Sequence, residues 1–166
     1  MTTEKTVFSK DLPNKRLTVE RSFDAPLPSV WEAWTDPAIL DQWWGPKPYR
    51  AETITMEFRV GGAWFYAMIG PNGDKTMCKV NFTAIVPDKS FSSTTVFCDD
   101  AGHTNPDLPL MNWKVDFSYA NGVTAVRTEI SFNKQADMEA IIAMGFQKGY
   151  TMGLGNLEEY LRTTVK

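Results

Sequence analysis

A long series of short alternating segments, joined by tight turns between residues 53 and 132, constrains the fold more than any other feature. Apolar and polar residues alternate over 113–119 and again over 124–132. Between these two segments stands Asn121-Gly122, which is typical of a two-residue hairpin turn. Gly61-Gly62 and residues 71–74 mark earlier turns of the same kind. Consecutive strands joined in this way predict an antiparallel meander.

Helical segments are expected on both sides of this meander. Residues 16–23 alternate as a half-buried strand, and two short helices follow, with Pro28 and Pro37 in their first turns, where proline is tolerated. Residues 135–162 show helical periodicity, and Gly145 is expected to kink or divide that helix. The polar loop 99–109 contains two prolines and is expected to be a mobile surface element. The order predicts an α+β fold, in which a curved antiparallel sheet wraps around a long C-terminal helix.

Length and composition indicate one domain and exclude some partners. We assign residues 1–14 to an N-terminal extension and residues 15–166 to a single domain, because 166 residues suit one hydrophobic core. The net charge is −3 without any basic run, which argues against a nucleic-acid partner. No window approaches the roughly 20 apolar residues that span a bilayer, so we expect no membrane partner. The polar N-terminus shows no signal peptide, and we expect a cytoplasmic protein.

Few side chains suit metal binding or catalysis. The single histidine, His103, lies in the polar loop, and Cys78 and Cys98 do not have the spacing of metal ligands. We therefore expect no metal and no other cofactor, and we assign no catalytic residue. The cysteines are interpreted as reduced core residues, while a disulfide between them stays open.

Three glycines, Gly145, Gly149 and Gly153, recur every four residues along one side of the predicted C-terminal helix. Glycine inside a helix costs about 1 kcal/mol relative to alanine, so something must offset it. Close packing of the helix on the sheet is one explanation, and space for a ligand is the other. In the second case helix and sheet enclose a small-molecule cavity. Its predicted lining is Trp64, Tyr66, Met68, Trp113, Phe117, Phe146, Gly149, Tyr150, Met152, Gly153, Asn156 and Tyr160.

A set of motifs carries a resemblance that extends from about Arg16 to Leu161. They are Phe23-Asp24-Ala25-Pro26, Val30-Trp31-Glu32-Ala33-Trp34-Thr35-Asp36-Pro37, Trp43-Trp44-Gly45-Pro46, Arg59-Val60-Gly61-Gly62-Ala63-Trp64, Gly149-Tyr150 through Leu157, and Tyr160-Leu161. With them the chain resembles the START-like (SRPBCC) superfamily of helix-grip folds. Within it, the chain is similar to the branch homologous to the C-terminal domain of the activator of the ninety-kilodalton heat-shock chaperone ATPase. Glu57 and Tyr150 depart from the pattern, where Asp and Trp are common.

The resemblance implies an apolar cavity between sheet and long helix, without a shared catalytic set. Our leading hypothesis is therefore a binding module for a small apolar or amphipathic molecule of unknown identity. One alternative is a stress-related co-chaperone or protein-interaction domain, which would have a chaperone partner. Another is an enzyme of the cyclase or aromatase kind, which needs a buried acid or base with a shifted pKa. Whether the chain forms a homodimer stays open.

Overall fold

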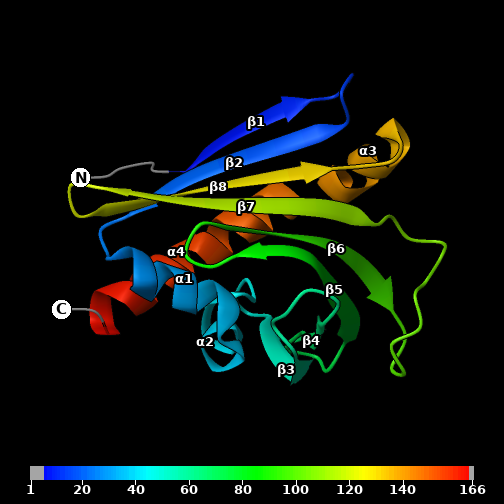
Figure 1. Ribbon diagram of the computed structural model, residues 1–166. Helices are drawn as coiled ribbons and strands as arrows, with labels where there is room; N and C mark the ends of the chain where they lie inside the picture. Colours follow the sequence, from blue (N-terminus) through cyan, green and yellow to red (C-terminus); the bar gives the residue numbers. More distant parts are fainter. Residues whose placement is uncertain (1–5, 165–166) are drawn as a thin grey trace.

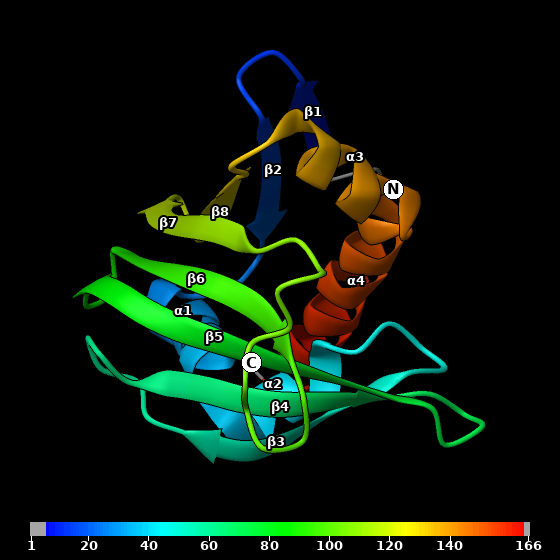
Figure 2. The ribbon, with the colours of Figure 1, turned by 90° about the vertical axis from the view of Figure 1, so that its right-hand side faces the viewer.

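Eight antiparallel strands form one sheet in the order β1-β2-β8-β7-β6-β5-β4-β3 in the computed structural model, which describes residues 6–164 (Figure 1). The strands are β1 (Val7–Asp11), β2 (Arg16–Phe23), β3 (Arg50–Met56), β4 (Ala63–Ile69), β5 (Lys75–Val86), β6 (Ser90–Cys98), β7 (Met111–Ala120) and β8 (Val123–Ser131). The helices are α1 (Leu27–Thr35), α2 (Pro37–Trp43), α3 (Gln135–Ala143) and α4 (Phe146–Thr164). Figure 2 shows α4 running along one face of the curved sheet, which confirms the predicted helix-grip fold.

The hairpin between β7 and β8 shows how local sequence sets the meander. Asn121 and Gly122 both have positive φ, 54° and 81°, as a type I′ turn requires. The turn aligns Trp113 with Ile130 and Phe117 with Val126, so that paired apolar side chains share one face. This face is buried, because Trp113, Val115 and Phe117 are buried on β7 while Lys114 between them is exposed. The predicted strands and their turn are therefore confirmed.

The break predicted at Gly145 divides the C-terminal helical region into two helices. Gly145 has φ +89°, which right-handed helix does not allow, and it separates α3 from α4. This glycine is thus a terminator, and it does not carry the cost of a helix-interior glycine. Only Gly149, Gly153 and Gly155 lie inside α4.

Two edges of the sheet differ from the sequence prediction. Residues 7–11, within the predicted extension, form the edge strand β1 and pair with β2 from Val7–Glu20 to Asp11–Arg16. At the other edge, Ile54 of β3 is 50% exposed although its alternation with Met56 predicts burial. The register of β3 shifts between Thr53 and Thr55, so Ile54 is the unpaired extra residue of a bulge and does not follow the alternation.

The loop after β6 folds back over the outer face of the sheet, as Figure 2 shows. Thr104 forms an isolated β-bridge with Cys98, and the Asn105 amide donates to the Phe97 carbonyl at 2.8 Å. The Asp99 carboxylate accepts hydrogen bonds from the amides of Ala101 and His103 at 2.9 and 2.8 Å. These bonds hold the first half of the loop, whereas we predicted a mobile element over its whole length.

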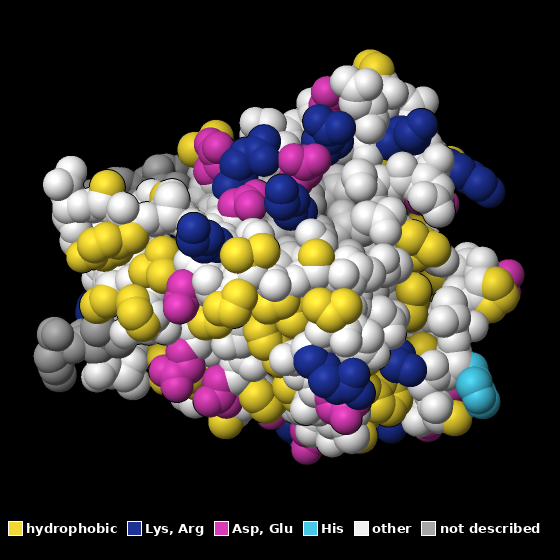
Figure 3. Space-filling view, viewed as in Figure 1, with side chains coloured by type: hydrophobic (Ala, Val, Ile, Leu, Met, Phe, Trp, Pro, Cys, Tyr) yellow, Lys and Arg dark blue, Asp and Glu magenta, His cyan; other side chains and the backbone are white. Residues whose placement is uncertain are grey.

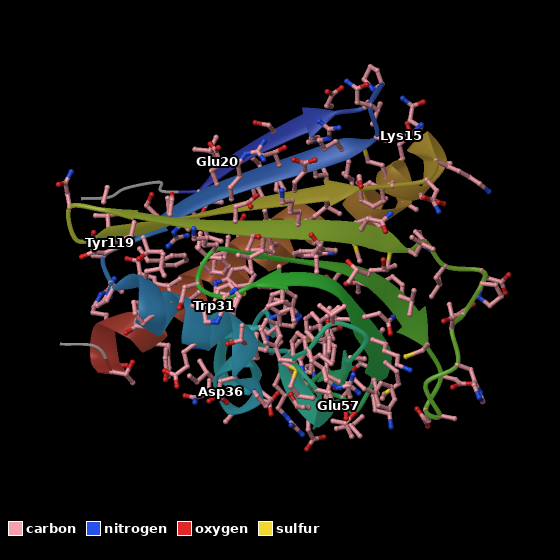
Figure 4. All side chains as sticks on the ribbon, viewed as in Figure 1. Lys15, Glu20, Trp31, Asp36, Glu57 and Tyr119 are labelled. Carbon is pink, nitrogen blue, oxygen red and sulfur yellow. The ribbon has the colours of Figure 1, made fainter. Side chains whose placement is uncertain are left out.

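Charges of opposite sign alternate on the outer face of β2 and β8, where Figure 3 shows Lys and Arg next to Asp and Glu. Arg127 lies 3.5 Å from Glu20 and 3.1 Å from Glu129, and Arg16 lies 3.2 Å from Glu129. Glu20 and Lys15 are labelled on this side of the molecule in Figure 4. The interleaved charges leave this face without a continuous basic stripe.

Candidate functional site

A cavity of about 270 Å³ lies between the sheet and the first turns of α4. The sheet contributes alternate residues of four neighbouring strands, because side chains two apart point to the same face. These residues are Tyr66, Met68, Thr76, Cys78, Thr95, Phe97, Met111 and Trp113. The opposite wall comes from the end of α2 and the α3–α4 region: Trp44, Pro46, Met144, Phe146, Gly149 and Tyr150. Figure 2 shows α4 facing these strands.

The rim of the cavity lies beside the break between α3 and α4. Met144 lines the cavity and is 59% exposed, and Thr76 on the sheet side is exposed as well. The break turns the chain so that Phe146, at the start of α4, contacts Trp113 of β7 at 6.0 Å between ring centroids. The cavity thus opens to solvent at one end and is closed by aromatic rings behind it.

The segment Trp44–Pro46 is held in the cavity wall by contacts on both sides. Gly45 approaches β3 so closely that a Cβ there would lie 2.6 Å from Arg50 Cα, which only glycine permits. On the other side, Asn156 of α4 donates to the carbonyls of Trp43 and Gly45 at 3.3 and 3.1 Å. The Trp44 ring is therefore fixed between the sheet and α4.

The polar groups of the cavity are neutral; Trp44, Tyr66 and Tyr150 have hydrogen-bond partners, whereas the buried Trp113 Nε1 has none among the described residues. Trp44 Nε1 donates to the Tyr66 hydroxyl at 2.9 Å, and the Tyr150 hydroxyl shares a 2.8 Å hydrogen bond with Thr128 Oγ1. Burial raises the pKa of the Cys78 thiol to about 11, and burial also raises the pKa of Tyr66 and of Tyr150 above the ordinary tyrosine value. All three groups are protonated at pH 7, so the cavity lining carries no charge.

A smaller chamber of about 30 Å³ lies deeper, beyond Trp44, Thr95 and Trp113, which line both spaces. It is enclosed by core residues such as Trp34, Trp64 and Phe91. This volume suits about one water molecule. Space for an organic ligand is therefore in the outer cavity.

Six of the predicted lining residues meet at this cavity: Tyr66, Met68, Trp113, Phe146, Gly149 and Tyr150. Trp64 lines the inner chamber instead and stacks on Tyr66 with ring centroids 4.1 Å apart. Phe117 does not line the cavity and packs behind it, 6.1 Å from Trp34 and 5.1 Å from Trp31, which Figure 4 labels beside α1. Met152 is 39% exposed on the outer side of α4.

Gly153, Asn156 and Tyr160 share the helix face of Gly149 but lie one or more turns further along α4. There the backbone after α2 covers this face, and a Cβ at Gly153 would lie 3.4 Å from the Trp44 carbonyl oxygen. Gly153 is thus a packing position, whereas a Cβ at Gly149 would meet only Pro46 Cγ, at 3.7 Å. Close packing therefore accounts for Gly153, whereas Gly149 borders the cavity.

Sequence reasoning missed Trp44, Pro46, Thr76, Cys78, Thr95, Phe97, Met111 and Met144. Two of these residues could have been predicted from the register of β4 and β5, because Tyr66 pairs with Cys78 and Met68 with Thr76 across the turn at residues 71–74. The turn signal was recognised, so the cross-strand partners of Tyr66 and Met68 were predictable from it. Trp44 and Met144 had no such signal, since their place depends on how separate helices approach.

The structure shows no metal-binding cluster within residues 6–164, where no group of three or more His, Cys, Asp and Glu side chains could hold an ion. Both cysteines are free. Cys78 pairs with Phe97 and Met77 pairs with Cys98, so the two cysteines occupy opposite faces of the sheet. Over the same residues, none of the helices has the length and hydrophobicity to cross a membrane.

Comparisons with solved structures agree with this architecture over nearly the whole chain. Protein Ms6760 from Mycobacterium smegmatis is 27% identical, with a TM-score of 0.89 over 98% of this chain and 99% of that one. A protein from Arthrobacter aurescens is also 27% identical, with a TM-score of 0.90 over 96% of this chain and 93% of that one. A protein from Staphylococcus epidermidis, 21% identical with a TM-score of 0.83 over 96% of this chain and 95% of that one, shares the fold.

No curated protein matches the chain in sequence. One family model, described as "Activator of Hsp90 ATPase homolog 1-like protein", matches residues 24–162. The match extends from the Asp24-Ala25-Pro26 motif to Arg162 in the last turn of α4 and contains every residue of the cavity wall. The chain therefore belongs to the family of activator of Hsp90 ATPase homolog 1-like proteins.

Proposed function

We propose that this protein binds a small, uncharged, apolar or amphipathic molecule in the cavity between β4–β7 and α4. The observation that carries the proposal is the cavity of about 270 Å³, open at one end and lined by apolar and neutral polar groups. A cavity of about 150 Å³ lined by apolar side chains is enough to bind benzene. The larger volume suits a molecule of about two fused rings.

The chemistry of the lining supports an uncharged ligand. Transferring an ionised carboxylate from water into a site without a partner charge is strongly unfavourable. The walls consist of aromatic rings, methionines, small polar groups and the protonated Cys78 thiol. An anion would therefore lose its hydration without gaining a partner, whereas an apolar molecule gains the transfer of its surface from water.

The same groups favour binding over acid–base chemistry. A general acid or base works best when its pKa is near the working pH. Burial raises the pKa values of Tyr66, Cys78 and Tyr150, all of which ordinarily titrate above neutrality, and so moves them further from it. The geometry thus supports a ligand held without proton transfer by these three groups.

The family description raises a co-chaperone role as the alternative. Such a role favours one contiguous exposed apolar surface. The large apolar side chains that are exposed come from different parts of the fold, among them Val7 on β1, Ile54 on β3, Val86 on β5 and Met152 on α4. The cavity, with its defined volume and lining, is the observation that favours small-molecule binding over this alternative.

Titration calorimetry with indane tests the proposal. A ligand of nine carbons that gains roughly 0.6–0.8 kcal/mol per atom binds with a Kd of about 5–100 µM. We expect one saturable site for indane and at least tenfold weaker binding for indane-2-carboxylate. Absence of saturable indane binding, or equal binding of the carboxylate, contradicts the proposal. Stimulation of an Hsp90 ATPase by protein that binds no indane supports the alternative.

A further inference from the structure

Two buried tyrosines line the cavity, and their hydroxyl groups have different partners. The Tyr150 hydroxyl is held by Thr128 Oγ1 of β8, at 2.8 Å, outside the cavity lining. The Tyr66 hydroxyl instead meets Trp44 Nε1 at 2.9 Å, inside the lining. An indole N–H only donates, so the phenol oxygen of Tyr66 is the acceptor in this bond. The O–H of Tyr66 is therefore left to donate to another group.

The neighbour of this O–H is the thiol of Cys78. Cys78 is the cross-strand partner of Tyr66 on β5 and lines the cavity beside it. Burial and then the interaction with Cys78 raise the pKa of Tyr66 well above its ordinary value. Sulfur is a weak hydrogen-bond acceptor, and Tyr66 is only 4% exposed, so bulk water does not replace it. The cavity wall thus presents a strong donor that has a weak partner.

We infer that the cavity selects uncharged ligands that carry one hydrogen-bond acceptor, such as a ketone, ester or ether oxygen, and that the Tyr66 hydroxyl donates to it. This inference rests on the function proposed above and adds the chemical class of the ligand. A carbonyl oxygen is a better acceptor than the Cys78 thiol, so the ligand gains a hydrogen bond at little cost. Trp44 holds the phenol ring in place while its oxygen remains in the lining.

A pair of nearly isosteric probes isolates this hydrogen bond. Indane and 1-indanone differ by one carbonyl group, and NMR titration gives the Kd of each. The measured quantity is the ratio of the indane Kd to the 1-indanone Kd, compared between the parent protein and Tyr66→Phe. The comparison removes the different water solubility of the two probes. We expect the ratio to fall about three- to tenfold in Tyr66→Phe, the range for one neutral hydrogen bond.

Tyr150→Phe is the matched control, since it removes the other buried hydroxyl of the same cavity. Tyr150→Phe can change the affinity for each probe, but the ratio of the two Kd values should stay within twofold of the parent value, because the Tyr150 hydroxyl lies against Thr128, which does not line the cavity. Equal ratios in the parent and Tyr66→Phe, with indane still bound, overturn the inference and leave the proposed function intact. If the parent protein binds neither probe, the inference and the proposed function are both contradicted.

A second measurement does not depend on the stability of Tyr66→Phe, which leaves the Trp44 N–H without its acceptor. The infrared carbonyl stretch of 1-indanone moves to lower wavenumber when the oxygen accepts a hydrogen bond. We expect this shift in the complex with the parent protein, relative to 1-indanone in hexane. A bound carbonyl with the hexane frequency contradicts the inference.

Discussion

Filling the space at Gly149 separates a ligand cavity from a packing contact. Gly149→Leu places a side chain in the cavity wall, where the first added carbon meets only Pro46 Cγ at 3.7 Å. Leucine is favoured over glycine in a helix by about 0.8 kcal/mol, and the cavity has room for the rest of the side chain. We therefore expect a free energy of unfolding up to about 1 kcal/mol higher, or roughly 2–4 °C in Tm.

Gly155→Leu is the control, because a Cβ at Gly155 meets nothing within 4 Å and the residue is exposed. Both variants gain the same helix propensity, but only Gly149→Leu should weaken indane binding, by at least tenfold. Denaturant titration and calorimetry measure the two effects. If Gly149 is instead tightly packed, overpacking lowers the free energy of unfolding by about 1–3 kcal/mol. A destabilised Gly149→Leu protein beside a stabilised Gly155→Leu protein would refute the reasoning.

Three further predictions concern the rest of the structure. Arg21 is 9% exposed and forms an ion pair with Glu158, so Glu158→Gln should lower the free energy of unfolding by about 2–4 kcal/mol in urea titrations. Arg162 pairs with the same carboxylate but is exposed, so Arg162→Met should lower it by less than about 0.5 kcal/mol. Equal losses in the two variants would contradict this prediction. The pKa of Cys78 rises from 9.0 to about 11 on folding, so the unfolded state releases this proton first. The contribution of Cys78 to stability should hold below pH 9 and fall by roughly 2–3 kcal/mol by pH 11, and Cys78→Ala should make the pH dependence between 9 and 11 shallower by that amount. Limited subtilisin digestion should cut first within the loop at residues 106–108, which are consecutive exposed residues outside any strand, and a first cut inside β7 would contradict the described topology.

The fold was largely predictable because local signals agree with the tertiary arrangement. Asn121-Gly122 fixes a turn, alternation over β7 and β8 fixes their buried face, and Gly145 ends a helix by its positive φ. β1 was missed because its five residues, with only Val7 and Phe8 apolar, show no pattern; pairing with β2 makes it a strand. Ile54 was misplaced because a bulge interrupts the alternation on which its burial depended.

The site was less predictable because it depends on where separate elements meet. Periodicity placed Gly149 and Gly153 on one helix face, but it did not show that the backbone after α2 covers Gly153 and leaves Gly149 at the cavity. The sequence does not distinguish Trp44 from other aromatic residues near helix ends. Its position in the cavity wall depends on the hydrogen bonds that Asn156 donates to the carbonyls of Trp43 and Gly45. Side-chain alternation identifies a face, whereas the approach of α2 and α4 decides which part of it stays open.

The indole N–H signals of the six tryptophans report most directly on whether the cavity binds a ligand. Trp44 and Trp113 line the cavity, whereas Trp31 packs against Phe58, Phe91 and Phe117, none of which lines it. In a titration of ¹⁵N-labelled protein with indane, the account predicts saturable shifts at Trp44 and Trp113 with one common Kd, and no shift at Trp31. Weak shifts at all six indoles that do not saturate, or shifts centred on Trp31, would contradict it.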